Sequence, residues 1–110
     1  PEHLMKIEYE AFSHNQLTTL TIPLNVESIG INAFESNQLT NVEFKGSVPA
    51  TVHYNIFKNN SGLTSNTIKV PTGTVEQYRN TQGKYGNNLY SPSQTWFGSD
   101  NAGLLDAFYE

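Results

Sequence analysis

Cysteine is absent from this chain of 110 residues, so disulfides and thiolate metal sites are excluded. Charge is also scarce, because 6 basic and 10 acidic side chains give a formal net charge of −4. The basic residues form no run, which removes the electrostatic basis for binding nucleic acid or an anionic membrane. No apolar stretch approaches the roughly 18 residues that span a bilayer. We therefore expect neither nucleic acid nor direct membrane insertion among the interactions of this chain.

Grouped catalytic side chains are a further absence. Catalysis needs a nucleophile with a base, paired carboxylates or a metal cluster in one place. The histidines (His3, His14 and His53) stand at unrelated positions, the glutamates are spread along the chain, and no glycine-rich phosphate loop occurs. We therefore predict a chain that is not an enzyme, with exposed histidines and with no catalytic, cofactor-binding or metal-binding residues.

What the chain does have is a repeat. The segment Ala11–Ile22 reappears as Ala33–Phe44, at an offset of 33 − 11 = 22 in the numbering. A third, looser copy follows at an offset of 56 − 33 = 23 and is stretched by an insertion after Asn60. A fixed period of about this length indicates one supersecondary unit stacked on its copies. The sequence therefore predicts an elongated solenoid.

Apolar residues alternate in each copy as they do in short strands. In the first copy Leu20 and Ile22 face inward, and Thr19 and Thr21 face outward. Strands that return on the same side one repeat apart pair in parallel, and we expect the crossover between them to be right-handed. The crossover at 29–34 has room for a turn of helix. The predicted strands lie near 19–22, 41–44 and 67–70.

A phenylalanine and an asparagine recur in every copy. We expect the phenylalanines to be buried as a ladder on the side opposite the strands, together with the alanine that precedes the first two. Each asparagine lies just before a strand, where its amide suits a hydrogen bond to the backbone of the turn. A solvated loop asparagine is the alternative. These residues are Phe12, Phe34 and Phe57, and Asn15, Asn37 and Asn60.

These residues together resemble a known family. From Leu17 to Leu39 the chain reads Leu-x-x-Leu-x-Ile-Pro-x-x-Val-x-x-Ile-Gly-x-x-Ala-Phe-x-x-Asn-x-Leu, which resembles the BspA-type leucine-rich repeat of bacterial surface proteins. The resemblance extends roughly from Leu4 to Tyr78. It implies an α/β fold: a right-handed leucine-rich-repeat solenoid with short parallel strands, short crossover helices or turns and a C-terminal helical cap. It also implies an extracellular location at the bacterial cell surface.

The end of the repeat pattern divides the chain into two parts. Residues 1–71 form the predicted leucine-rich-repeat array of about three repeats, the first of them truncated. Residues 72–110 form a C-terminal cap and an irregular tail rich in aromatic residues and glycine. Thr74 begins a capping box, and the helix that follows should end near Gly83 and lay Tyr78 over the core.

The aromatic residues of the tail leave two interpretations open. A short helix from Asn101 would place Leu104, Leu105 and Phe108 on one face, where they would cover the end of the solenoid. The aromatic rings could instead stack on sugars. In that case the chain is a carbohydrate-binding accessory module of an extracellular enzyme. The aromatic residues of the tail are Tyr85, Tyr90, Trp96, Phe97, Phe108 and Tyr109.

The outward side chains of the strands form the predicted ligand-facing surface. They are polar and lightly charged, and they lack the aromatic anchors that dominate many interfaces. We therefore expect weak contacts with a protein or a cell-surface ligand, multiplied along an array. The predicted function is a non-catalytic interaction module of an adhesin-like protein, and a structural spacer or stalk is the alternative. The surface comprises Thr19, Thr21, Asn41, Glu43, Lys45, Thr67 and Lys69.

The N-terminal end of the array carries its own expectation. The chain opens without a basic-then-apolar leader, and Leu4 falls inside a repeat unit, so we expect a fragment of a longer protein. The first strand then has an unpaired edge, and such edges invite pairing with another chain. We expect self-association through this truncated end, or lower stability there.

Overall fold

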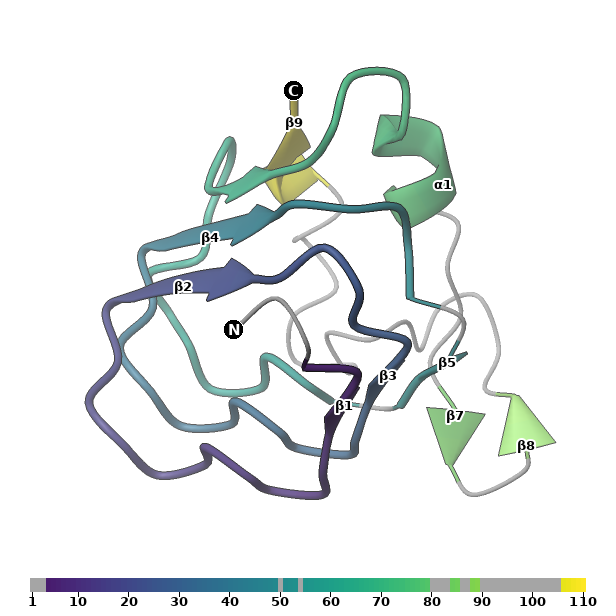
Figure 1. Ribbon diagram of the computed structural model, residues 1–110. Coiled ribbons are helices and arrows are strands. Elements are labelled where there is room, and N and C mark those ends of the chain that lie inside the picture. The colour runs from purple at the N-terminus through teal and green to yellow at the C-terminus, as the bar shows by residue number, and fades with distance from the viewer. Residues whose placement is uncertain (1–3, 50, 54, 80–83, 86–87, 90–105) are drawn as a thin grey trace.

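The computed structural model describes residues 4–49, 51–53, 55–79, 84–85, 88–89 and 106–110. Three coils of chain are stacked one behind another along the line of sight in Figure 1, and most of their strands are very short. The elements are β1 (Lys6–Ile7), β2 (Thr19–Ile22), β3 (Ser28–Ile29), β4 (Asn41–Phe44), β5 (Thr51–Val52), β6 (Ile68–Lys69), α1 (Val75–Arg79), β7 (Lys84–Tyr85), β8 (Asn88–Leu89) and β9 (Phe108–Tyr109).

The main sheet has the order β2-β4-β6-β9, and its neighbouring strands are parallel. The register pairs Thr19 with Asn41 and Ile22 with Phe44, which is the predicted offset of one repeat. Parallel strands therefore lie at all three predicted places, although β6 is shorter than the predicted strand at 67–70. In β2, Ile22 is buried, Leu20 is partly buried, and the two threonines are exposed, as the alternation predicts.

A second sheet, which the sequence did not reveal, lies across the stack from the first. It consists of β1, β3 and β5, also in parallel, and it pairs Ile7 with Ile29 and Ile29 with Val52. Each coil thus contributes one strand to each sheet (Figure 1). Apart from the antiparallel pair β7 and β8, the described residues show parallel strands with little helix, the arrangement of a leucine-rich-repeat solenoid. No helix among these residues has the length and apolar character needed to cross a bilayer.

Within the described residues of the three coils, the crossovers between the strands are irregular turns and contain no turn of helix. Two positions of each coil have positive φ angles, of 56° at Asn32 and 58° at Ser36 in the second coil. A left-handed residue cannot continue a right-handed helix. The helical option expected at 29–34 is therefore wrong, and the turn option holds. The equivalent positions, Glu10, Asn55, His14 and Asn59, are also left-handed.

Close packing of successive coils explains the glycine of the pattern. A Cβ atom added to Gly30 would lie 2.5 Å from the backbone nitrogen of Tyr9 in the preceding coil. Only glycine permits this approach without a shift of the backbone.

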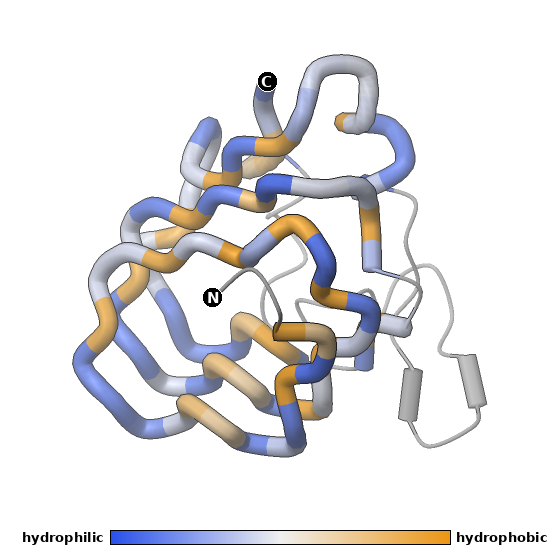
Figure 2. Tube along the Cα trace, in the orientation of Figure 1, coloured by the Kyte–Doolittle hydropathy of each residue, from blue (hydrophilic) through white to orange (hydrophobic). Residues whose placement is uncertain are grey.

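The phenylalanine ladder is present, with one correction. The Phe12 and Phe34 rings stack at 5.4 Å with an interplanar angle of 2°, and Phe57 stacks on Phe34 at 6.1 Å. Figure 2 shows these apolar segments in the same place in successive coils. Phe34 and Phe57 are buried, but the expectation is wrong for the first copy, because Phe12 is 42% exposed and Ala11 is exposed. Among the described residues no coil lies on the outer side of this first copy.

The recurring asparagines bond the turn backbone as predicted. The Nδ2 group of Asn37 donates to the carbonyls of Phe34 in its own coil and Phe12 in the coil before, at 3.0 and 2.9 Å. Asn60 repeats both bonds in the third coil. Asn15 is exposed and, among the residues that the structure describes, bonds only within its own coil, so the solvated alternative describes the first copy in part.

On the C-terminal side of the stack, β9 pairs with β6 and α1 packs beside β9. The Tyr78 ring of α1 is fully buried between Phe44 and Phe108, at 4.9 and 5.6 Å, and its hydroxyl donates to the Gly46 carbonyl at 2.7 Å. Burial raises the pKa of this hydroxyl well above its ordinary value of 10.0. The predicted end of the helix near Gly83 lies outside the described residues.

The final strand corrects the interpretation of the tail. Phe108 lies in β9 and is buried beside Ile68 of β6, so the helix predicted to carry it does not include it. The outer edge of β6 offers hydrogen-bonding groups to a strand, and the Val70 N–H donates to the Tyr109 carbonyl at 2.8 Å. The predicted start of that helix at Asn101 lies outside the described residues.

Candidate functional site: the strand surface

The outward side chains of the main sheet stand in a row set by the strand register. Thr21 lies opposite Glu43, Glu43 opposite Lys69, and Lys69 opposite Tyr109. Side chains directly opposed across strands are close enough to contact one another. The outward face of β2, β4, β6 and β9, called the strand surface below, therefore brings a hydroxyl, a carboxylate, an ammonium and a phenol into one line.

Two further predicted residues, Thr19 and Asn41, form a second line beside the first. They are opposed to each other at the start of β2 and β4, and both are exposed. Thr67 lies just before β6, and its hydroxyl donates to the Thr64 carbonyl at 2.8 Å. The Thr67 hydroxyl is therefore already hydrogen-bonded within its own loop. Compared with Thr19 and Asn41, Thr67 offers a ligand the fewest free hydrogen-bonding groups.

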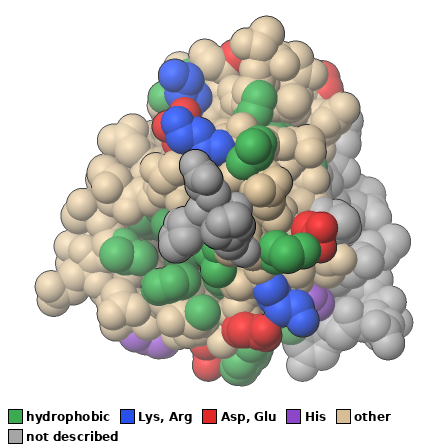
Figure 3. Space-filling view, in the orientation of Figure 1, with side chains coloured by type: hydrophobic (Ala, Val, Ile, Leu, Met, Phe, Trp, Pro, Cys, Tyr) green, Lys and Arg blue, Asp and Glu red, His purple; other side chains and the backbone are tan. Residues whose placement is uncertain are grey.

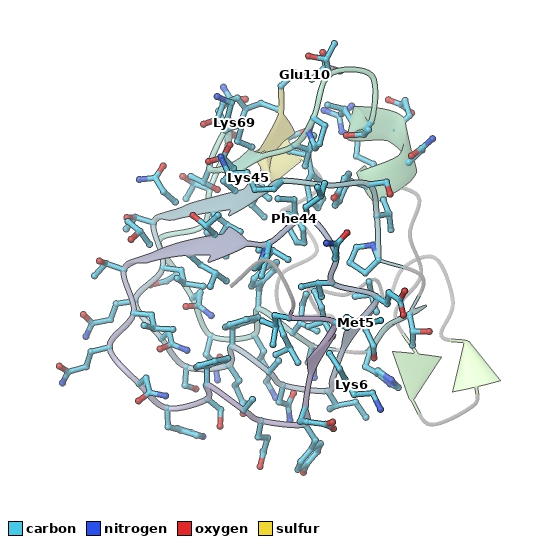
Figure 4. All side chains as sticks on the ribbon, viewed as in Figure 1. Met5, Lys6, Phe44, Lys45, Lys69 and Glu110 are labelled. Carbon is cyan, nitrogen blue, oxygen red and sulfur yellow. The ribbon has the colours of Figure 1, made fainter. Side chains whose placement is uncertain are left out.

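Charges on the strand surface are partly neutralised. Lys45 Nζ lies 3.4 Å from Glu43 Oε2, and both side chains are substantially exposed. Within the described residues, Lys69 has no carboxylate within 4.0 Å. Figures 3 and 4 show two basic side chains beside an acidic one at this side of the molecule, with Lys45 and Lys69 labelled in Figure 4. Lys69 therefore keeps a positive charge that a partner can meet.

A shallow hollow of about 190 Å³ lies in the strand surface. Its lining joins Thr19 and Thr21 of β2 and Glu43 of β4 to Lys69 and Tyr109. Pockets for small molecules usually enclose about 300–1,000 Å³. The hollow is smaller and open, and its size suits single side chains of a macromolecular partner.

Comparison with known families fits this architecture. A family model described as a BspA type leucine rich repeat region (6 copies) matches residues 1–85, which is most of the chain. The chain belongs to the BspA-type leucine-rich repeat family. No curated protein and no solved structure matches it. Members of leucine-rich-repeat families are typically non-catalytic and generally mediate protein binding, and the BspA type is typical of surface proteins.

In this BspA-type array, Tyr109 is the residue of the strand surface that sequence reasoning missed. The repeat pattern ends long before it, at Pro71, so no offset of the repeat pointed to a strand at 108–109. Its side chain is half-buried at the end of the row formed with Lys69. The alternation of buried Phe108 with outward Tyr109 was the only local signal, and a single pair is too short to recognise as a strand.

The histidines of the BspA-type array do not converge. His14 Nε2 lies 3.7 Å from Glu35 Oε1 at the turn, and His53 lies at the end of β5. The expectation of an exposed side chain is wrong for His53, whose ring is half-buried and whose buried Nδ1 has no hydrogen-bond partner within the described part of the chain. The described residues contain no group of three histidine, aspartate or glutamate side chains that could hold a metal ion. His3 lies outside them.

Proposed function

We propose that this BspA-type array is a non-catalytic adhesion module at the bacterial cell surface, and that it binds a protein through the strand surface. The observation that carries the proposal is the hollow bounded by Tyr109 and Lys69, in register with Glu43 and Thr21. Tyrosine is among the residues enriched at binding hot spots, because it combines a large apolar ring with a hydrogen-bonding end. The strand surface thus holds the aromatic anchor that the repeats alone lack.

The charges of the strand surface indicate the chemistry of the partner. Glu43 is held by Lys45 at 3.4 Å, whereas Lys69 stands without a carboxylate within the described residues. An acidic side chain of the partner, placed between Lys69 and Tyr109, would meet both a positive charge and a phenol hydroxyl. Complementary charge of this kind sets orientation and specificity more than affinity. Avidity from several such contacts would then strengthen adhesion.

The C-terminal part of the chain takes a double role in this proposal. Residues 1–71 supply the array, and residues 72–110 both cap it and complete its binding surface. Two contacts support the cap: Tyr78 packs between Phe44 and Phe108, and its hydroxyl bonds the Gly46 carbonyl. Completion of the surface rests on β9, because Tyr109 lies beside Lys69.

Two alternative functions make different demands. A carbohydrate-binding module needs accessible aromatic platforms. Phe108 does not provide one because it is 2% exposed, and Tyr109 is the tail aromatic that lines the hollow. A spacer or stalk needs no ligand-facing residue, so substitutions on the strand surface would leave its behaviour unchanged. The strand surface itself therefore offers the test.

Adhesion of beads coated with the chain to an immobilised extract of extracellular-matrix proteins provides the experiment. We expect Tyr109→Ala and Lys69→Ala each to reduce the apparent affinity about tenfold, the effect of losing a moderate hot spot. Lys6→Ala is the matched control, since it removes an exposed lysine from the second sheet. Adhesion that all three variants retain, or lose equally, would contradict a role of the strand surface.

A further inference from the structure

A second hollow, of about 240 Å³, lies on the outward face of the sheet formed by β1, β3 and β5. Its lining comes from all three coils: Lys6 and Glu8 from the first, Ser28 and Gly30 from the second, and His53 from the third. The hollow therefore lies on the side of the stack and not at either end of it. It is called the second-sheet hollow below.

The strand register arranges this lining in two outward rows. The first row pairs Lys6 with Ser28. The second row lies two residues further along each strand, on the same face of the sheet. The Gly30 and His53 N–H groups donate to the carbonyls of the preceding coil, at 2.7 and 2.9 Å, which keeps the second row in the same register. This second row consists of Glu8, Gly30 and His53.

Gly30 leaves a gap in the middle of the second row. A Cβ atom at this position would lie 2.5 Å from the Tyr9 nitrogen, so a residue with a side chain would force the backbone to shift. Gly30 consequently lines the hollow with backbone alone. A carboxylate from Glu8 and an imidazole from His53 stand on the two sides of this gap.

The two charged side chains of the hollow are both uncompensated. Glu8 and Lys6 are exposed, and within the described residues neither lies within 4.0 Å of an opposite charge. Glu43 of the strand surface differs, because Lys45 lies 3.4 Å from it. In Figure 3 a basic side chain, an acidic side chain and a histidine lie together at this side of the molecule, and Figure 4 labels Lys6 there. The second-sheet hollow thus offers one free charge of each sign.

His53 adds a polar atom that lacks a partner. Its Nδ1 is buried and has no hydrogen bond among the residues that the structure describes. In a neutral imidazole with its proton on Nε2, Nδ1 is an acceptor. In the described part of the chain, the other buried side-chain atoms of this kind are Asn32 Oδ1 and Asn55 Oδ1, in the turns after β3 and β5. Buried polar atoms are nearly always satisfied, so His53 calls for a donor from a bound molecule.

The size and the apolar lining of the hollow limit that molecule further. Pockets for drug-sized ligands usually enclose about 300–1,000 Å³, so a volume of about 240 Å³ suits a smaller molecule. The half-buried Ile31 and the Tyr9 ring, 63% exposed, also line the hollow. A matching ligand is therefore small, carries both charges and has an apolar group.

We propose that the second-sheet hollow binds a free α-amino acid with an apolar side chain. Its ammonium group donates to the Glu8 carboxylate and to His53 Nδ1, and its carboxylate accepts from the Lys6 ammonium. Its side chain lies against Ile31 and Tyr9. Lys6 and Glu8 are two residues apart on an extended chain, roughly 6.6 Å between Cα atoms, so their flexible side chains can bracket adjacent opposite charges. A ligand with a single charge would leave one of them uncompensated.

L-leucine titrated into the full chain provides the test, followed through the amide resonances at neutral pH and low ionic strength. We expect saturable shifts at Lys6, Gly30 and His53, with a Kd on the order of 1 mM. The signals of Glu43 and Lys69 should stay in place, because they belong to the other sheet. The ¹⁵N signal of His53 Nδ1 should also move, since it reports directly on a new hydrogen bond to this atom.

Two analogues of leucine test whether both charges are recognised. N-acetyl-L-leucine lacks the ammonium group, and L-leucinamide lacks the carboxylate. Each should bind at least about fivefold more weakly than leucine, the effect of losing one exposed ion pair. The analogues also imitate the two ends of a peptide. Equal binding of either one would assign the hollow to a peptide terminus and overturn the proposal.

Substitutions in the chain test the same contacts from the other side. Glu8→Gln and Lys6→Gln should each weaken leucine binding about fivefold, and both chains should still fold because these side chains are exposed. Glu10→Gln is the matched control for the carboxylate, since Glu10 is equally exposed in the same coil but does not line the hollow. Lys69→Gln is the control for the ammonium.

Three results would overturn the proposal. One is absence of saturable shifts up to about 10 mM leucine, ten times the expected Kd. Another is equal weakening by Glu10→Gln and Glu8→Gln, which would indicate a general effect of charge. The third is an unchanged His53 Nδ1 signal at saturation. The proposal does not depend on the strand surface, and Glu8→Gln should leave adhesion unchanged, so the two proposals fail separately.

Discussion

The first and second coils carry nearly the same residues in different surroundings. Phe34 has a coil on each side and is 1% exposed, whereas within the described residues Phe12 stacks on one side only and is 42% exposed. Asn37 is buried and bridges two coils, but Asn15 is exposed. In a solenoid each repeat gains most of its stability from its neighbours. The same sequence motif therefore has a different energetic value at each place in the stack.

The largest expected effect is a difference in stability between the Phe34→Ala and Phe12→Ala variants. Phe34→Ala should lower the free energy of unfolding by about 3–5 kcal/mol, the usual cost of a cavity left by a core phenylalanine. Phe12→Ala should cost less than about 2 kcal/mol, since much of its ring is already in water. Urea denaturation followed by circular dichroism measures both. Equal losses would show that the Phe12 ring is as well covered as the Phe34 ring in solution.

The asparagine ladder should show the same contrast at a smaller scale. Asn60→Ala leaves the Leu39 N–H and the Phe34 and Phe57 carbonyls without their side-chain partner in a buried place. We expect a loss of about 2–3 kcal/mol. Asn15→Ala should cost less than about 1 kcal/mol, because water replaces its bonds. A larger loss for Asn15 than for Asn60 in the same denaturation experiment would contradict the comparison.

Tyr78 tests the C-terminal side of the described coils, where the effect should be smaller still. Tyr78→Phe leaves the buried Gly46 carbonyl without its donor at 2.7 Å, so we expect a loss of about 1–2 kcal/mol near neutral pH. The matched control is Tyr9→Phe, because the Tyr9 side chain is 63% exposed.

The same residue predicts a dependence of stability on alkaline pH. Burial raises the pKa of Tyr78 in the folded chain, while the unfolded chain ionises near the ordinary value of 10.0. Above that pH the unfolded state releases a proton that the folded state keeps, so the free energy of unfolding falls as pH rises. Tyr78→Phe should flatten this decline above a pH of about 10. An unchanged slope in the variant would assign the decline to other groups.

The sequence predicted the main sheet because its signal is repeated. Leu20 and Val42 occupy one slot of a repeat, and the offset between them is the register of the pair in the structure. The second sheet carries the same repeat, because its paired residues Ile7, Ile29 and Val52 stand at offsets of 29 − 7 = 22 and 52 − 29 = 23. It was not recognised as a sheet, since a strand as short as Ser28–Ile29 offers one buried position and no alternation. The sequence allowed either a turn or a turn of helix at the crossovers. The left-handed backbone at Asn32 and Ser36 shows that they are turns.

The candidate site was predicted in part for the same reason. Glu43 and Lys69 occupy repeat slots and lie in one row, as expected from the offset. Tyr109 joins them through a pairing between β6 and β9 that no repeat encodes. Whether a distant segment pairs with the free edge of a sheet depends on the tertiary structure. The local sequence of the segment carries little information about that pairing.

The place of β9 has a consequence for the order in which the chain folds. The paired residues of β2 and β4 are 41 − 19 = 22 apart, those of β4 and β6 are 68 − 42 = 26 apart, and those of β6 and β9 are 108 − 68 = 40 apart. Closing the longer loop costs more entropy, and non-local pairing slows folding. We expect β9 to join last and to leave first. Hydrogen exchange should then protect the Val42 N–H, bonded to Thr67, better than the Val70 N–H, bonded to Tyr109. A brief opening of the chain would thus remove Tyr109 from the strand surface while the three coils stay wound, and the reverse order of protection would refute this sequence of events.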